Sequence, residues 1–132
     1  MKISRSTGYA LVAVGFVAEA SKEKPVMAAK ISKEYNIPLE YLLKILQQLV
    51  RVNILRSKRG PRGGFSLARD TKDITILQII EAVEGPMMTH ANLTELTGNA
   101  GFSVKMEKAC NEATDKLRAI YSSAILSDML AG

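Results

Sequence analysis

The sequence predicts a mainly α-helical fold with one small two-stranded β-hairpin and a long helix near the C-terminus. Three observations support this. Helix-forming stretches with periodic apolar residues fill most of the chain up to residue 84 and return from 104 to 121. A glycine-rich and proline-containing segment, 58–64, separates two short β-type runs. With 132 residues, 47% of them hydrophobic and 23% charged, the composition is that of one folded domain.

The first helix is expected from Ser4 to Ala20, with Ser4 or Ser6 as its N-cap. Its apolar face is predicted to hold Tyr9, Val12, Ala13, Phe16 and Val17. The apolar run from Tyr9 to Ala18 resembles a secretory signal peptide, with Ala18-Glu19-Ala20 as its cleavage site. Because Gly15 interrupts it and charged residues follow it, we interpret the run as a buried first helix instead.

We expect a cytoplasmic protein. No stretch reaches the roughly 18 to 20 apolar residues that a membrane span needs. The single cysteine, Cys110, cannot form an internal disulfide, which fits a reducing compartment or an intermolecular role for the thiol.

A second helix, Met27 to Tyr35, is expected to end at Asn36-Ile37-Pro38, and a third helix then runs from Leu39 to Val52. One stripe of the third helix is apolar: Leu39, Leu42, Leu46, Leu49 and Val50. Another is polar: Glu40, Lys44, Gln47, Gln48 and Arg51. Two helices joined by a short turn, the second with a polar and basic outer face, make a helix-turn-helix whose second helix fits the major groove of DNA.

Two strands, Ile54 to Ser57 and Phe65 to Ala68, are predicted next, joined by 58–64. The glycines of this turn supply the positive φ angles that a tight hairpin requires. A basic hairpin directly after a recognition helix is a wing, and Arg59 at its tip could enter a minor groove. The fold class is therefore a winged helix-turn-helix.

The charge distribution favours a polyanionic partner. Residues 41–69 hold seven of the eighteen basic residues and no acidic one, which leaves eleven basic and thirteen acidic residues elsewhere. A local basic field on a helix-turn-helix and a wing is typical of nucleic-acid binding. The sequence contains no catalytic constellation, so we expect no enzyme activity.

After the wing, a fourth helix is expected from Ile74 to Glu84, capped by Asp73 or Thr75 and stopped by Gly85-Pro86. Residues 87–102 lack periodicity and predict a long loop with room for one helical turn, of a length that is often functional. The last helix, Val104 to Tyr121, carries an apolar seam that needs a partner, and a second copy of the chain would supply it. The seam comprises Met106, Ala109, Cys110, Ala113, Leu117, Ile120, Tyr121 and Ala124.

These motifs together resemble the Rrf-two family of bacterial winged-helix transcription regulators. The resemblance covers about residues 1–86, with a weaker similarity at 125–130, and rests on five segments. They are Gly8-Tyr9-Ala10-Leu11, Ile37-Pro38-Leu39-Glu40-Tyr41-Leu42, Arg59-Gly60-Pro61-Arg62-Gly63-Gly64-Phe65, Ile74-Thr75-Ile76 and Glu81-Ala82-Val83-Glu84-Gly85-Pro86. The resemblance implies a homodimer, joined through its long helices, that binds a palindromic operator in double-stranded DNA and represses or activates transcription.

The family resemblance also implies site residues. Its base-reading positions correspond to Glu40, Leu43 and Lys44, with Arg59 in the minor groove. Leu43 departs from relatives that carry a polar side chain there, because it offers only packing or contact with a thymine methyl. From the residues themselves we add Gln47 and Gln48 as base contacts and Tyr41, Gly60 and Pro61 to the interface. As phosphate contacts we expect Arg51, Arg56, Lys58, Arg62 and the hydroxyls from Ser4 to Thr7.

Within this one folded unit we expect three parts: 1–86 for DNA binding, 87–103 as an effector loop for a small molecule or protein, and 104–132 as the dimerisation helix and C-terminal segment. Family members that bind an iron-sulfur cluster carry three cysteines before the long helix, whereas residues 87–109 contain none, so we expect no such cluster and no cofactor. Cys110 and His90 are the remaining metal-ligand candidates. The alternative functions are a redox or metal sensor using these two residues, or a winged-helix module that binds a protein.

Overall fold

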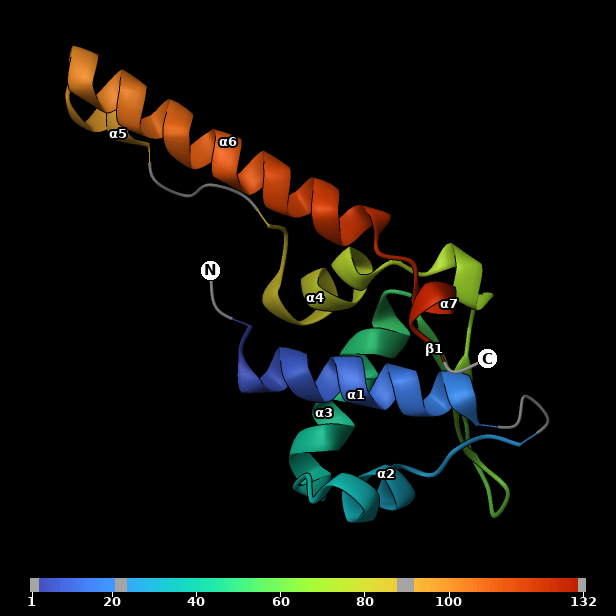
Figure 1. Ribbon diagram of the computed structural model, residues 1–132. Helices are drawn as coiled ribbons and strands as arrows, with labels where there is room; N and C mark the ends of the chain where they lie inside the picture. The colour runs from blue at the N-terminus through green and yellow to red at the C-terminus, as the bar shows by residue number, and fades with distance from the viewer. Residues whose placement is uncertain (1–2, 21–23, 88–91, 131–132) are drawn as a thin grey trace.

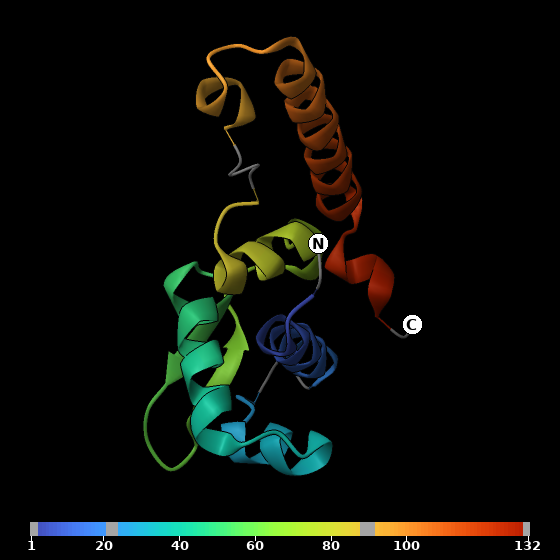
Figure 2. The same ribbon diagram turned by 90° about the vertical axis from the view of Figure 1, so that its left-hand side faces the viewer.

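A computed structural model describes residues 3–20, 24–87 and 92–130 and confirms a mainly helical winged helix-turn-helix with a long C-terminal helix (Figure 1). A body of helices and a two-stranded sheet carries a helical arm that projects from it (Figure 2). The elements are α1 (Arg5–Glu19), α2 (Ala28–Tyr35), α3 (Leu39–Arg51), β1 (Leu55–Lys58), β2 (Gly64–Leu67), the 3₁₀ helix η1 (Thr71–Asp73), α4 (Ile76–Glu84), α5 (Leu93–Leu96), α6 (Gly101–Ser123) and α7 (Leu126–Met129).

Helix α1 is capped by Ser4, whose hydroxyl oxygen accepts a hydrogen bond from the Thr7 amide. The predicted apolar face is partly wrong, since Val12 is 41% exposed. The buried face consists of smaller residues, namely Thr7, Ala10, Ala13, Val14 and Val17. Small side chains let α1 lie close to α3, α4 and β2, and this proximity places α1 at the centre of the core.

The turn between α2 and α3 follows the prediction. Asn36 adopts the left-handed conformation, with φ 53° and ψ 49°, and the Ser32 hydroxyl donates to the Ile37 carbonyl oxygen. The buried face of α3 consists of Leu42, Ile45, Leu46 and Leu49. Leu39, expected on the apolar stripe of this helix, does not join its buried face: it is the first residue of α3 and is 41% exposed.

The wing is an antiparallel pair in which Leu55 faces Leu67 and Lys58 faces Gly64. Both strands lie one residue from their predicted positions. Val26, before α2, also forms an antiparallel β-bridge with Phe65 through two backbone hydrogen bonds of 2.8 Å, which the sequence did not indicate. Gly64 makes this approach possible, since its φ is +144° and a Cβ there would lie 2.5 Å from the Val26 carbonyl oxygen.

Helix α4 begins with a capping box in which Thr75 and Gln78 satisfy each other's backbone amides, and it ends at Gly85 with φ 84°. Two carboxylates on its last turns join it to other elements. Glu84 accepts hydrogen bonds from the hydroxyls of Ser4 and Thr7 at the start of α1. These two hydrogen bonds lower the pKa of the Glu84 carboxyl below its ordinary value.

Glu81 joins α4 to the arm. Its Oε2 lies 2.7 Å from Nη1 of Arg118 on α6 and accepts a hydrogen bond of 2.7 Å from the Met87 amide. Arg118 also donates to the Met87 carbonyl oxygen at 3.3 Å. One ion pair therefore fixes both the long helix and the beginning of the segment that follows α4.

Helix α6 begins three residues before the predicted helix and runs to Ser123. Its expected seam divides into two faces. Leu117 and Tyr121 pack against Leu77 and Ile80 of α4 in the same chain, so they are not free for a partner. Among the other seam residues, Met106 and Ile120 are 55% and 64% exposed, Ala109, Cys110 and Ala113 are exposed, and Ala124 is half-buried.

The C-terminal segment returns to the body. Ile125 forms a β-bridge with Thr75, and the Leu126 amide donates to the Ile74 carbonyl oxygen at 2.9 Å. Leu126 is 3% exposed and belongs to the main core. Among the described residues, no helix combines the length and apolar character needed to cross a membrane.

We predict that Gly64→Ala destabilises the fold by about 2 kcal/mol, because alanine would adopt a positive φ and its methyl group would collide with the Val26 carbonyl. Chemical denaturation measures the free energy of unfolding. The matched control is Gly15→Ala inside α1, where nothing lies within 4 Å of the new methyl group and a gain of about 0.5–1 kcal/mol is expected. Equal stabilities of the two variants would contradict this account of Gly64.

We predict that Glu84→Gln changes the acid branch of the stability profile. The pKa of Glu84 in the folded chain is below 4.5, so the ionised carboxylate stabilises the fold at higher pH, and this stabilisation is lost as the pH falls through the folded pKa. The free energies of unfolding of wild type and variant should converge as the pH falls below about 4.5. Urea denaturation at a series of pH values measures this, and a constant difference would show that Glu84 is not the titrating group.

Candidate nucleic-acid interface

The residues predicted to bind DNA come together on one surface, formed by the outer face of α3 and the wing. The α3 contributors Glu40, Tyr41, Leu43, Lys44, Gln47 and Arg51 are exposed, and Gln48 is half-buried. From the wing, Arg56 and the whole tip from Lys58 to Arg62 are exposed. The hairpin and α3 lie on the same side of α1, to its left in Figure 2.

A groove of about 430 Å³ separates α3 from the wing. It is lined by Leu43 and Gln47 on the helix side and by Lys58, Arg59 and Gly60 on the wing side. The beginning of α2, from Met27 to Ala29, closes the third side. Met27 is not among the predicted site residues, because it lies before α2 in the sequence and comes beside the wing only through the tertiary Val26–Phe65 bridge.

A second groove, of about 570 Å³, lies on the other side of α3, beside the first turn of α1. Lys44 and Arg51 line it together with Ser6 and Tyr41. The Tyr41 hydroxyl is hydrogen-bonded to the Ser6 hydroxyl, and its ring packs edge-on against Tyr9 at 5.8 Å between centroids. Contacts with α1 thus orient Tyr41 in the groove that Lys44 and Arg51 also line.

One predicted phosphate contact is wrong. Thr7 is fully buried, and its hydroxyl donates to Glu84 at 2.5 Å, so it cannot reach a phosphate on the surface. Ser4 is exposed, but its hydroxyl also donates to Glu84. In this arrangement, Ser6 is the serine of the first α1 turn that lines the groove beside α3.

The basic residues of 41–69 have different roles. Arg69 is half-buried and donates to the carbonyl oxygens of Asn53 and Asp73, so it supports the fold. The guanidinium of Arg56 donates to the Ala68 carbonyl at 3.3 Å and lies along the sheet. The cations whose side chains extend from the surface of α3 and the wing tip are Lys44, Arg51, Lys58, Arg59 and Arg62.

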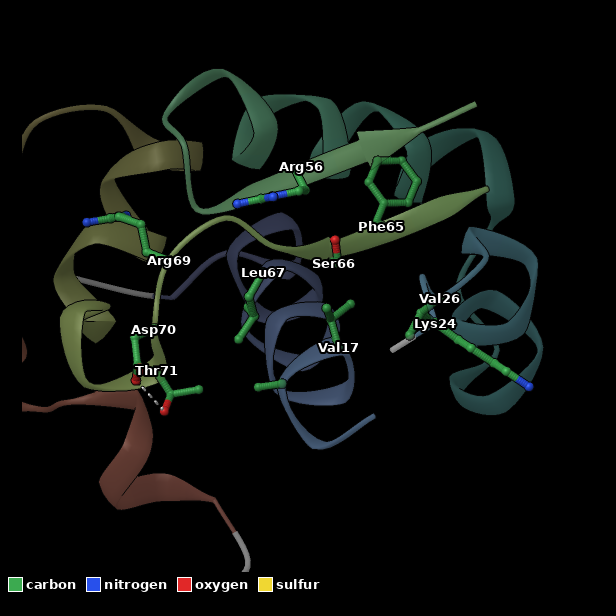
Figure 3. Close-up of a pocket in the computed structure, with 11 residues that line it drawn as sticks. Val17, Lys24, Val26, Arg56, Phe65, Ser66, Leu67, Arg69, Asp70 and Thr71 are labelled. Atoms are coloured by element: carbon green, nitrogen blue, oxygen red, sulfur yellow. Dashed lines mark hydrogen bonds between the residues drawn. The ribbon is translucent and has the colours of Figure 1, made fainter. Parts of the chain in front are cut away.

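A cavity of about 260 Å³ lies behind the wing, between the end of α1, β2 and η1 (Figure 3). Val17, Val26 and Leu67 line it, and Lys24 and Arg69 extend away from it at opposite ends. Its charged groups therefore do not converge on a common point, as they would in a built anion site.

Of the two metal-ligand candidates, Cys110 lies among the described residues. Cys110 is exposed on α6, whereas His90 lies outside the described residues. Within 3–20, 24–87 and 92–130, no three His, Cys, Asp or Glu side chains are grouped so that they could hold a metal ion.

Comparison with known proteins agrees with this fold. The model of the Rrf2 (Rrf-two) family, described as an iron-dependent transcriptional regulator, matches residues 3–132. The chain is 40% identical over 86 residues to the HTH-type transcriptional regulator IscR of Cereibacter sphaeroides, covering 64% of this chain and 56% of IscR. It is 38% identical over 81 residues to an HTH-type regulator of Aquifex aeolicus, covering 61% and 56%. The matched stretch thus spans little more than half of each relative.

Solved structures share the fold over nearly the whole chain. The global cysteine regulator CymR of B. subtilis superposes with a TM-score of 0.84 at 24% identity, over 98% of this chain and 95% of CymR. IscR of T. potens gives a TM-score of 0.69 at 26% identity, over 98% and 85%. The helix-turn-helix, the wing, the long helix and the family match over residues 3–132 together show that this chain belongs to the Rrf2 family of transcriptional regulators, which are not enzymes.

Proposed function

We propose that this chain is a homodimeric, sequence-specific DNA-binding regulator that represses transcription by occupying a palindromic operator. The observation that carries the proposal is the exposure of five cations on the neighbouring elements α3 and the wing: Lys44, Arg51, Lys58, Arg59 and Arg62. Because residues 41–69 contain no acidic side chain, this field is not neutralised from within the segment. Such a surface is complementary to a phosphate backbone.

In the proposed complex, α3 lies in the major groove and its outer side chains meet base edges. Lys44 can donate to the O6 and N7 acceptors of guanine, and Glu40 can accept from the amino group of cytosine. Gln47, which is exposed on the next turn, can pair with adenine. The wing places Arg59 at a minor groove, where a narrow groove strengthens the negative potential.

Contacts with DNA phosphates on both sides of α3 would hold this helix in position in the major groove. Arg51, Ser6 and Tyr41 line the groove beside α1, and Lys58 lines the groove beside the wing. These contacts fix the orientation of the protein on the duplex and do not depend on base sequence.

Dimerisation would use the exposed apolar face of α6. Phe102, Met106 and Ile120 are 62%, 55% and 64% exposed, and the small residues Ala109 and Ala113 lie between them at helical spacing. A stripe of this kind on a projecting helix is stabilised by burial against a second copy. Two copies related by a two-fold axis would present two α3 helices to two half-sites of an operator.

A signal would enter through the segment between α4 and α6, as a small molecule or a protein. The beginning of this segment is held by the Glu81–Arg118 pair, so a ligand that displaces Met87 would disturb both α4 and α6. This arrangement supports the segment 87–103 as the effector part of the proposed regulator.

We predict that Lys58→Ala and Arg59→Ala weaken DNA binding in different ways. Loss of the Lys58 charge should lower the slope of log K against log salt by about one unit per bound protomer at every sequence. Arg59→Ala should weaken binding mainly at sites with a narrow minor groove. Fluorescence anisotropy at several salt concentrations measures both, with Lys72→Ala on η1 as the control. An unchanged slope in Lys58→Ala and unchanged affinities in Arg59→Ala would contradict the proposed interface.

We predict that Met106→Glu produces a folded monomer, because a charge in the centre of the apolar face of α6 would be desolvated in a dimer. Sedimentation velocity measures the mass, and operator affinity should fall with the loss of the second reading helix. Lys108→Glu, a charge change on the same helix, is the control and should remain dimeric. A dimeric Met106→Glu would place the interface elsewhere.

A further inference from the structure

Three apolar side chains are exposed within the candidate interface. Met27 is 59% exposed, Leu39 is 41% exposed and Leu43 is 38% exposed. None of them belongs to either of the two hydrophobic cores of the described residues. Leu43 therefore does not pack in a hydrophobic core of the described residues, which leaves contact with a thymine methyl as the other role expected from the sequence.

The three side chains share one location. Leu39 and Leu43 are one turn apart on α3 and both line the groove between this helix and the wing. Met27 precedes α2 and lines the same groove from the third side. We call these three residues the apolar strip.

Cations and a polar side chain border the apolar strip. Lys58 and Arg59 line the same groove from the wing, Lys44 follows Leu43 on α3, and Gln47 continues the line of Leu39 and Leu43 by one further turn. A partner protein with an apolar surface would leave these cations facing apolar atoms. A DNA duplex is complementary to both the cations and the apolar strip. Its phosphates pair with the cations, and its major groove presents one apolar group, the 5-methyl of thymine.

We propose that the apolar strip reads thymine 5-methyl groups, so that each half-site of the operator contains a thymine opposite Leu43 and a second apolar contact opposite Leu39. This proposal rests on the proposed function, since it requires α3 to lie in a major groove. It adds the chemical class of base that the recognition helix selects: bases with a methyl group at C5. The N-terminal half of a recognition helix, where Leu39 and Leu43 lie, is the part that reaches base edges.

The experiment begins with the full chain and a pool of random duplexes, from which bound sites are selected and sequenced. Each thymine of the selected site is then replaced singly by deoxyuridine, which keeps the base-pairing edge and removes only the 5-methyl group. Affinities for thymine and deoxyuridine duplexes are measured by fluorescence anisotropy for wild type, Leu43→Ala, Leu39→Ala and Val12→Ala. Val12 is a matched control, because it is 41% exposed but lies on α1, outside the strip.

The expected result is a selected site with at least one fixed thymine per half-site. Replacing that thymine by deoxyuridine should weaken binding by wild type and by Val12→Ala about fourfold, the effect of burying one methyl group. In Leu43→Ala, affinity for the thymine duplex should fall while the difference between the two bases disappears. Leu39→Ala should do the same at a neighbouring thymine. Because both leucines are exposed, these substitutions should leave the fold intact, which circular dichroism checks.

Two different failures are distinguishable. If wild type selects a discrete site but binds every deoxyuridine duplex as tightly as the thymine duplex, the methyl readout is wrong and the proposed function stands. The same conclusion follows if Leu43→Ala and Leu39→Ala retain the full preference for thymine. If wild type selects no discrete site and binds random DNA equally well, the proposed function itself is wrong.

Discussion

The close packing of α1 at the centre of the body is the constraint on which the rest of the structure depends. Ala10, Ala13 and Val14 are completely buried, and their small size lets α3, α4 and β2 contact the same helix. Larger side chains at these positions would separate the elements. Because the inner face of α3 is held against α1 in this way, its opposite face is left exposed beside the wing, and this geometry creates the candidate interface.

Helix α4 connects the packed body around α1 to the projecting helix α6. Glu84 accepts hydrogen bonds from the hydroxyls at the start of α1, and Glu81, one turn earlier, pairs with Arg118 of α6 and with the Met87 amide. A nine-residue helix thus connects the first turn of α1, beside the groove lined by Ser6 and Tyr41, with the long helix. Hydrogen-bond networks and rigid elements of this kind carry coupling between distant sites when they have two discrete arrangements.

The interface combines two kinds of surface that serve different purposes. In the proposed complex, the cations of α3 and the wing tip would provide an attraction to DNA that is strong at low salt and independent of base sequence. The polar and apolar side chains on the outer face of α3 would provide contacts whose energy depends on the base opposite them. Arg69 shows that a cation in the same run of sequence can have neither role, because its hydrogen bonds to Asn53 and Asp73 use its guanidinium within the fold.

Local sequence determined much of this protein. The ends of α2 and α4, the turn at Asn36, the wing and the basic character of 41–69 follow from residues that act within a few positions of each other, such as caps, glycines and periodic leucines. Contacts between distant residues were decided only by the tertiary structure. Thr7 was assigned to DNA but hydrogen-bonds to Glu84, seventy-seven residues away, and the apolar seam of α6 is divided because α4 covers Leu117 and Tyr121. Amphipathic spacing shows that a helix has an apolar face, but which neighbour covers that face depends on how the whole chain packs.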